Sequence, residues 1–148
     1  MKKTVIRKTK QEVPAILVGC MRQAGFTDAP FSPQQMNHFI HTAVEHGANY
    51  FDHADIYGFG RAETVFGEAM KLSGSTLKRE DLILQSKCGI RQGCFDSSRG
   101  HILEAVDGIL KRLQTGTGDQ PDGVQYRPFR DDHIWDRGKH DLRRIRRS

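Results

Sequence analysis

A unit made of a short apolar strand and an amphipathic helix occurs three times before residue 114, and this repeat restricts the fold more than any other feature. The strands end at Gly19, Asp52 and Lys87. Each helix has one apolar stripe at helical spacing. The stripes are Met36, Phe39, Ile40, Ala43 and Val44; Ala62, Val65, Phe66, Ala69 and Met70; and Ile102, Ala105, Val106, Ile109, Leu110 and Leu113. The pattern predicts parallel strands buried beneath helices.

The spacing of the strand ends suits two α/β architectures. Gly19, Asp52 and Lys87 lie 33 and 35 residues apart, as in a (β/α) barrel or a doubly wound sheet. The phosphate-binding glycine fingerprint of a doubly wound sheet does not follow Gly19, which favours the barrel. Residues 4 to 18 predict a hairpin that leads into the first buried strand. Ser32, followed by proline and three residues later by glutamine, predicts the start of the first helix.

The apolar residues needed for a core lie in the first part of the chain. The 148 residues have a mean hydropathy of -0.61 and a net charge of +5, so the core has to be concentrated in one region. Between residues 115 and 148 the only aliphatic side chains are Val124, Ile134, Leu142 and Ile145. We therefore predict a folded domain over residues 1–114 and a basic, disordered tail over residues 115–148.

The cysteines and the N-terminus indicate a cellular compartment. Cys20, Cys88 and Cys94 are odd in number and lack the spacing of a metal site, which predicts free thiols under reducing conditions. The basic N-terminus is not followed by the apolar segment of a secretory signal, and no apolar run reaches the roughly 18 residues of a membrane span. We expect a cytoplasmic protein without a membrane partner.

An acid, a phenol and an amine follow two neighbouring strands. Asp52 and Lys87 end these strands, and Tyr57 lies in the loop after Asp52. Polar residues at the carboxyl ends of parallel strands face the functional side of such folds. An ammonium group near a phenol lowers the pKa of the phenol, and a carboxylate would hold the amine charged and oriented. The set suits a tyrosine that protonates a carbonyl oxygen as it gains electrons.

The same residues also allow structural interpretations. Asp52 could cap the following loop, Tyr57 could lie at a polar boundary, and Lys87 could extend its amine to solvent from a strand end. His53 and Asp55 could be offered as metal ligands, but no third ligand stands at a recognisable spacing, so we expect no metal.

Two segments of the sequence resemble the aldo-keto reductase superfamily. ANYFDHADIYGFGRAETVFGEAM is similar to the signature of that family, and LILQSKCGI resembles its next strand, which carries a catalytic lysine. The hairpin, the VGCM segment and the LKRLQT helix extend the resemblance over residues 4 to 115, and bacterial oxidoreductases are the most similar branch. The resemblance implies a partial (β/α)8 TIM barrel of about three β/α units after an N-terminal hairpin.

The resemblance also implies roles for individual residues. Tyr57 would be the general acid, Lys87 the amine that lowers its pKa, and Asp52 the carboxylate paired with the lysine. The backbone of Gly19, Cys20 and Met21, together with Asp52, would line the nicotinamide pocket. The implied reaction is reversible hydride transfer from NADPH to an aldehyde or ketone, a small-molecule carbonyl substrate.

The chain departs from the family after the third helix. The family continues with an apolar fourth strand and a histidine that completes a catalytic tetrad, whereas residues 115–140 contain no apolar run, so we expect no fourth strand. His133 and His140 lie among charges and do not fit the missing role. We predict a truncated reductase that is inactive alone and whose tail is an out-of-frame or otherwise aberrant extension. Its open sheet edges would favour self-association.

A binding module is the alternative from another functional class. The tail ends in LRRIRRS and also contains aromatic residues, which could contact RNA or an acidic surface. The same tail carries six Asp, so we favour a solvated segment and do not expect nucleic acid as a partner. A third hypothesis for the function is a non-catalytic member of the family that senses the cofactor.

Overall fold

The computed structural model describes residues 1–7, 10–25 and 29–115, together with the backbone of residues 124–128. In chain order the elements are β1 (Lys3–Val5), β2 (Glu12–Pro14), β3 (Val18–Gly19), the 3-10 helix η1 (Arg22–Ala24), α1 (Pro33–Glu45), β4 (Tyr50–Asp52), α2 (Arg61–Ser73), the 3-10 helix η2 (Arg79–Asp81), β5 (Ile83–Cys88), β6 (Ile90–Arg91), β7 (Cys94–Phe95), α3 (Arg99–Leu113) and β8 (Val124–Pro128).

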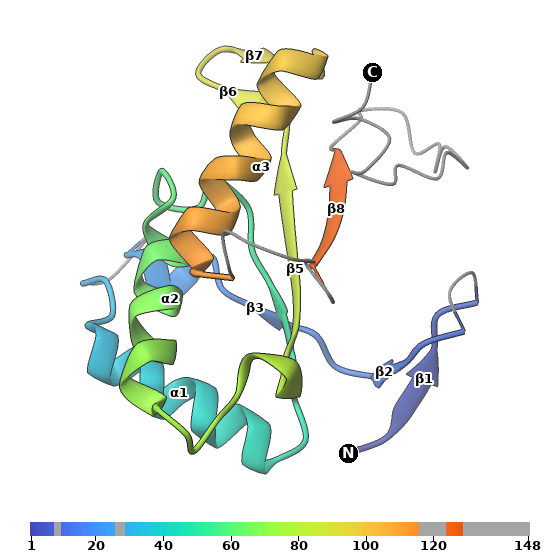
Figure 1. Cartoon of the computed structure of the whole chain (residues 1–148), viewed down its shortest axis with the longest axis vertical. Helices are drawn as coiled ribbons and strands as arrows, with labels where there is room; N and C mark the ends of the chain where they lie inside the picture. The colour runs from blue at the N-terminus through green and yellow to red at the C-terminus, as the bar shows by residue number, and fades with distance from the viewer. Residues whose placement is uncertain (8–9, 26–28, 116–123, 129–148) are drawn as a thin grey trace.

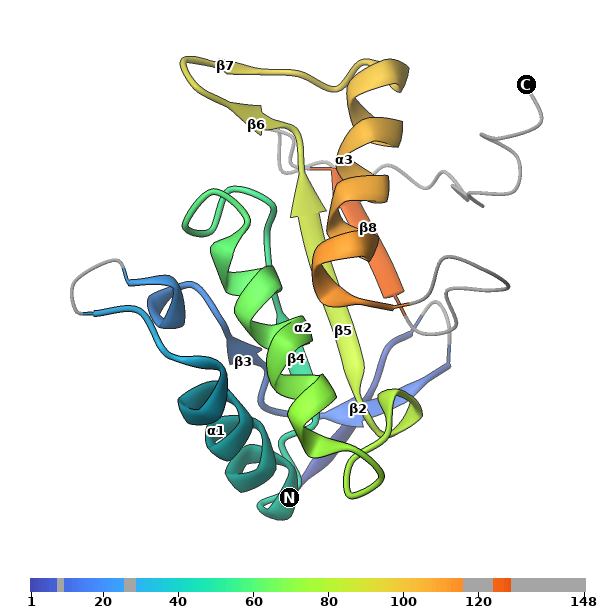
Figure 2. The same cartoon turned by 60° about the vertical axis from the view of Figure 1, so that its left-hand side comes forward.

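Four parallel strands form the central sheet in the order β3-β4-β5-β8. Val18 is level with Phe51, and Phe51 is level with Leu84. The helices α1, α2 and α3 cover one face of this sheet (Figure 1, Figure 2). The predicted α/β fold with parallel β-α units is therefore confirmed, and among the described residues the sheet remains open at β3 and β8.

Two antiparallel hairpins lie outside the parallel sheet. The first pairs β1 with β2, from Lys3 opposite Pro14 to Val5 opposite Glu12, and confirms the predicted N-terminal hairpin. The second pairs β6 with β7 and turns through Gly93, whose φ is 79°. No strand of this second hairpin was predicted from the sequence. A two-strand hairpin of two residues each leaves almost no periodic pattern to detect.

The first helix begins as its sequence predicts. The Ser32 hydroxyl accepts a hydrogen bond from the Gln35 backbone N–H at 3.2 Å, and the Gln35 side chain accepts one from the Ser32 N–H at 2.8 Å. Pro33 occupies the first helical position, where its missing N–H has no helical partner to lose. This capping box fixes where α1 starts, and hence which of its faces meets the sheet.

The core lies between the helices and the sheet. The Phe51 and Phe66 rings join strand to helix, edge to face at 5.2 Å. At Gly67 a Cβ atom would lie 2.2 Å from the Arg112 carbonyl oxygen, so glycine allows α2 and α3 to pack closely. The buried cluster is Cys20, Met36, Ile40, Phe51, Val65, Phe66, Ala69, Leu77, Leu82, Leu84, Cys88, Ile109 and Leu113.

The expectation that no fourth strand follows the third helix is wrong. The strand β8 pairs in parallel with β5, from Leu84 opposite Val124 to Cys88 opposite Pro128. Main-chain hydrogen bonds hold an outer strand to its neighbour whatever its side chains are, so the lack of an apolar run did not exclude it. Proline ends the strand, a position that a sheet tolerates.

Most predictions for the tail fall outside the described residues. These include the disorder of residues 116–123 and 129–148, His133, His140 and the terminal arginines. The division of the chain at residue 115 stays a prediction. In the part of the chain that the structure describes, no helix is both long and apolar enough to cross a membrane.

Candidate active site

Asp52 and Lys87 form an ion pair at the carboxyl ends of β4 and β5. The Lys87 Nζ donates to Asp52 Oδ1 at 2.5 Å and to the His53 carbonyl oxygen at 2.8 Å. The Lys87 and Asp52 side chains are 25% and 15% exposed, so the pair is neither free in solvent nor sealed in the core. Parallel pairing of the strands brings the two residues together although 34 residues separate them along the chain.

Tyr57 reaches the same place from the loop between β4 and α2. Gly58 and Gly60 have φ values of 58° and 84°, which tighten the loop, and the Tyr57 N–H donates to the Ala54 carbonyl at 3.0 Å. The Lys87 Nζ lies 5.2 Å from the centre of the Tyr57 ring, within the range of a cation–π contact. The three residues singled out by the sequence therefore meet in one cluster.

The segment from Gly19 to Met21 borders this cluster. Gly19 is level with Asp52 across the β3–β4 pair, and the Cys20 N–H donates to the Asp52 carbonyl at 3.0 Å. A Cβ atom on Gly19 would meet no atom within 4 Å, so the backbone there is open. The Cys20 side chain is buried, and burial, with the charge of Asp52, raises the pKa of its thiol well above the usual range.

Two side chains beside Asp52 were not anticipated. The Gln85 Nε2 donates to Asp52 Oδ1 at 2.8 Å, and the Tyr50 hydroxyl donates to Gln85 Oε1 at 2.7 Å. The signal was present in the sequence, because Tyr50 and Asp52 lie two residues apart, as do Gln85 and Lys87. Such spacing places the members of each pair on the same face of a strand.

A second ion pair lies on the other face of β5. Glu63 is fully buried; it accepts hydrogen bonds from the Ser86 hydroxyl at 2.5 Å and from the Arg112 Nε at 2.7 Å. Burial raises the pKa of the Glu63 carboxyl, and the bonds from Ser86 and Arg112 oppose that increase. This network ties α2, β5 and α3 together. The sequence interpretation assigned no role to its members.

His53 lies inside the core. Its ring packs edge to face on Phe66 at 4.8 Å, and neither ring nitrogen has a hydrogen-bond partner among the described residues. Burial, and then the charge of Lys87, lower the pKa of His53 to about 3, so the ring is neutral at physiological pH. Within the described ranges, no group of three or more His, Cys, Asp or Glu side chains could hold a metal ion.

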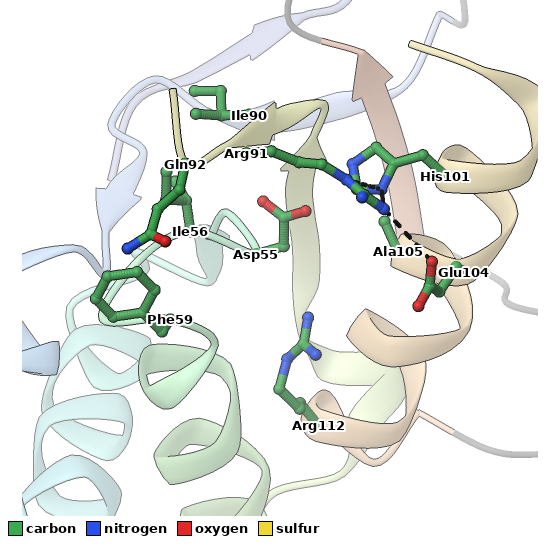
Figure 3. A pocket seen from close by; sticks show the side chains of 10 residues that line it. All are labelled: Asp55, Ile56, Phe59, Ile90, Arg91, Gln92, His101, Glu104, Ala105 and Arg112. Carbon is green, nitrogen blue, oxygen red and sulfur yellow. Dashed lines mark hydrogen bonds and ion pairs between the residues drawn. The ribbon is translucent and has the colours of Figure 1, made fainter. Parts of the chain in front are cut away.

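Asp55 faces a different region from His53. It lines a surface hollow of about 580 Å³ between the Tyr57 loop, the β6–β7 hairpin and α3 (Figure 3). Burial raises the pKa of the Asp55 carboxyl, and the charges of His101 and Arg112 partly offset that effect. Arg91 crosses the rim and donates to the His101 Nδ1 at 3.1 Å from its Nε. None of the three clustered residues lines this hollow.

Comparison with known proteins gives this arrangement a context. Residues 15–127, well over half of the chain, match the aldo/keto reductase family. This chain belongs to that family. The match extends through most of β8, beyond the end of the resemblance seen in the sequence.

Individual proteins resemble the chain over part of their length. Oxidoreductase YdhF of Escherichia coli is 34% identical over 96 residues, which are 60% of this chain and 32% of that protein. The uncharacterized oxidoreductase YcsN of Bacillus subtilis is 36% identical over 95 residues, 57% of this chain and 31% of its own. The aldo-keto reductase AKR11C1 from Bacillus halodurans, solved in a holo form, has a TM-score of 0.63 and 32% identity, covering 85% of this chain and 40% of that one.

The chain thus spans about a third of the length of these two curated oxidoreductases. Its described strands correspond to part of the family's TIM barrel. On β8 the residue level with Lys87 is Arg127, and none of residues 124–128 is a histidine. The fourth tetrad member that the resemblance implied is therefore not found on this strand.

Proposed function

We propose that the cluster at the ends of β4 and β5 performs proton transfer in the NADP(H)-dependent reduction of an aldehyde or ketone. The observation that carries this proposal is the position of the Lys87 ammonium, 2.5 Å from Asp52 Oδ1 and 5.2 Å from the centre of the Tyr57 ring. One amine therefore contacts both a carboxylate that holds it and a phenol that it can influence.

The proposed chemistry assigns one task to each side chain. Tyr57 donates its phenolic proton to the carbonyl oxygen of the substrate as that oxygen gains negative charge. The positive charge of Lys87 stabilises the phenolate that remains. Asp52 keeps the ammonium in place, because its carboxylate accepts one of the ammonium protons.

The residues bordering the cluster fit a place for the nicotinamide. We assign this role to the backbone of Gly19, Cys20 and Met21 and to Asp52. In support, the space above Gly19 is open and Met21 is 38% exposed. NADPH, when bound, supplies the hydride, and the protein supplies position and the proton.

We expect the 148-residue chain on its own to show little or no turnover. A TIM barrel closes with eight strands, and the described parallel sheet contains four. We also propose that the edges β3 and β8 favour self-association, since both present unpaired main-chain groups within the described sheet. Sedimentation of the chain at increasing concentration would test this, and a constant monomer mass would refute it.

The catalytic assignment is tested in a chimera, because inactivity of the chain alone would be uninformative. Residues 15–127 replace the corresponding segment of the Bacillus halodurans aldo-keto reductase, and NADPH oxidation is followed with a generic aldehyde. Tyr57→Phe should lower kcat by about 10²-fold or more, the usual contribution of a general acid. Lys87→Met should have a similar effect.

Lys71→Met provides the matched control, because Lys71 lies exposed on α2 and away from the cluster. It should leave turnover unchanged. An active chimera that retains its rate with Tyr57→Phe would refute the proposed role of the tyrosine.

A further inference from the structure

We propose that Tyr50 and Gln85 are positioning residues, which hold the Asp52 carboxylate and through it the Lys87 ammonium in a fixed orientation. The inference rests on the proposed function in one respect, since the proposed function gives the Asp52–Lys87 pair a role in proton transfer. The positioning itself is a property of the described side chains. It can be tested whether or not the chain turns over.

The four side chains alternate between two neighbouring strands. Tyr50 and Asp52 project from the same face of β4, and Gln85 and Lys87 from the same face of β5. Asp52 is directly level with Gln85. Tyr50 and Lys87 therefore stand at opposite ends of a zigzag in which each side chain contacts the next one on the other strand.

From both ends of this zigzag the donors point toward Asp52. A carboxylate only accepts, so the Gln85 amide must turn its Nε2 toward Asp52, at 2.8 Å. The Gln85 Oε1 then faces Tyr50, whose hydroxyl donates to it at 2.7 Å. The reverse amide orientation would place Oε1 against the Asp52 carboxylate with no proton between them. Tyr50 thus stabilises the amide orientation that serves Asp52.

The donors converge on one oxygen of the carboxylate. Asp52 Oδ1 accepts from both Gln85 Nε2 and Lys87 Nζ. With Gln85 bonded to this oxygen, rotation of the carboxylate about its own axis breaks two bonds instead of one. The carboxylate therefore presents the same oxygen to Lys87.

Burial separates the two supporting residues from the reacting groups. Tyr50 and Gln85 are only 7% and 8% exposed. They lie beneath the ion pair, where they act through the bond of Gln85 to Asp52. Buried hydrogen bonds of this kind exclude water and keep a unique arrangement.

The test follows the ammonium protons of Lys87 in the full chain, labelled with 15N. These protons are bonded to Asp52 and to the His53 carbonyl, and should exchange slowly with water. Tyr50→Phe removes a single oxygen atom, and Gln85→Met removes the amide with little change in length. Each should speed the exchange of the Lys87 protons by about fivefold, the equivalent of one hydrogen bond of about 1 kcal/mol. Either variant suffices if the other fails to fold.

A combined variant tests whether the effect travels along the zigzag. Tyr50→Phe should have no further effect on Lys87 exchange once Gln85→Met is present, because the path from Tyr50 then has no link to Asp52. Gln35→Met is the matched control: Gln35 bonds to Ser32 at the start of α1 and is not a member of the zigzag, so its loss should leave Lys87 exchange unchanged.

Two results would overturn the positioning role. One is Lys87 exchange that is the same in folded Tyr50→Phe, folded Gln85→Met and the unsubstituted chain. The other is an additive effect in the combined variant, which would indicate general loosening of the core. Failure of the proposed function would appear elsewhere, as a chimera whose rate does not depend on Tyr57, so the two failures are distinguishable.

Discussion

Ser86 and Lys87 are neighbours on β5, yet they belong to ion-pair networks on opposite faces of the sheet. On the helix side, Ser86 and Arg112 bind Glu63, which is fully buried. On the other side, Lys87 binds Asp52, and both side chains retain some exposure. The N···O distances of the two ion pairs are similar, 2.7 Å and 2.5 Å, so bond length does not distinguish the two pairs.

Exposure of the carboxylate separates the two pairs, since the two cations are similarly exposed, Arg112 at 30% and Lys87 at 25%. The Glu63 carboxylate is enclosed between α2, β5 and α3, and its bonds connect these three elements. The Asp52–Lys87 pair lies at the open strand ends beside Tyr57 and Gly19. Removing the partner of a buried charge leaves that charge uncompensated, whereas a partly exposed charge stays in contact with water. We therefore infer a structural role for the first pair and a functional role for the second.

The largest loss of stability should come from removing Arg112, the partner of the buried Glu63 carboxylate. Arg112→Met leaves the Glu63 carboxylate in the core with Ser86 as its remaining bonded partner. The free energy of unfolding should fall by about 3–5 kcal/mol, because an uncompensated buried charge remains. Urea denaturation followed by circular dichroism would measure the loss.

The control for this experiment is Arg61→Met. Arg61 is exposed at the start of α2, and its replacement should change stability by less than about 0.5 kcal/mol. Equal losses for Arg112→Met and Arg61→Met would remove the distinction between the buried pair and an ordinary surface charge.

The second-largest loss of stability depends on pH and arises from the buried ring of His53. The pKa of His53 is about 3 in the folded chain and about 6.5 when unfolded, so the unfolded state binds the extra proton between these values. Stability is full above about pH 6.5 and should decrease by about 1.4 kcal/mol per pH unit as the pH falls toward 3. His53→Phe removes this dependence and should be more stable than the unsubstituted chain at pH 5 by about 2 kcal/mol.

Unfolding curves between pH 7 and pH 4 would test the His53 prediction. His38→Phe is the control, since His38 is exposed on α1 and should leave the pH dependence of stability in place. Parallel pH profiles for His53→Phe and the unsubstituted chain would show that the ring is not buried in its neutral form.

A smaller loss of stability is expected when the partly exposed Asp52–Lys87 pair is broken. Lys87→Met leaves Asp52 partly exposed and still bonded to Gln85, so the unfolding free energy should fall by only about 1 kcal/mol. Denaturation of this variant beside Arg112→Met compares the two faces directly. A loss as large as that of Arg112→Met would place the Lys87 pair among the structural contacts.

The smallest change in stability is expected for the exposed Lys3–Glu12 ion pair on the N-terminal hairpin. Lys3 and Glu12 approach within 3.6 Å across the N-terminal hairpin, with side chains 67% and 66% exposed. Glu12→Gln should produce no measurable change in stability, because solvent screens such pairs. A clear shift of the urea midpoint would mean that exposure alone does not rank the ion pairs of this chain.

The sequence predicted the elements that have a local signature. Apolar stripes at helical spacing predicted α1, α2 and α3, and the Ser32 capping box located the start of α1. The strand β8 was missed because main-chain bonds to β5 place it in the sheet. No pattern of side chains predicts such bonds. The hairpin of β6 and β7 was missed because each strand has only two residues.

The candidate site was predictable to the same degree. Asp52 and Lys87 follow neighbouring apolar runs, and parallel strands bring such residues together. Gln85 and Arg112 were not identified, because a glutamine inside a strand and an arginine at a helix end are common and acquire meaning only through contacts across 33 and 49 residues of chain. Their catalytic or supporting roles stay proposals.

The alternation along β5 also determines where this gene segment can tolerate insertions. A single additional codon between Ile83 and Ser86 would shift every later side chain of the strand to the opposite face. Lysine would then point under the helices and serine toward the open side, so Asp52 would lose Lys87 and Glu63 would lose Ser86 in one event. An extra codon at the turn through Gly93, where a Cβ atom would meet nothing within 4 Å, would leave both networks intact. Length variation among homologous genes should therefore be found at this hairpin and not within β5.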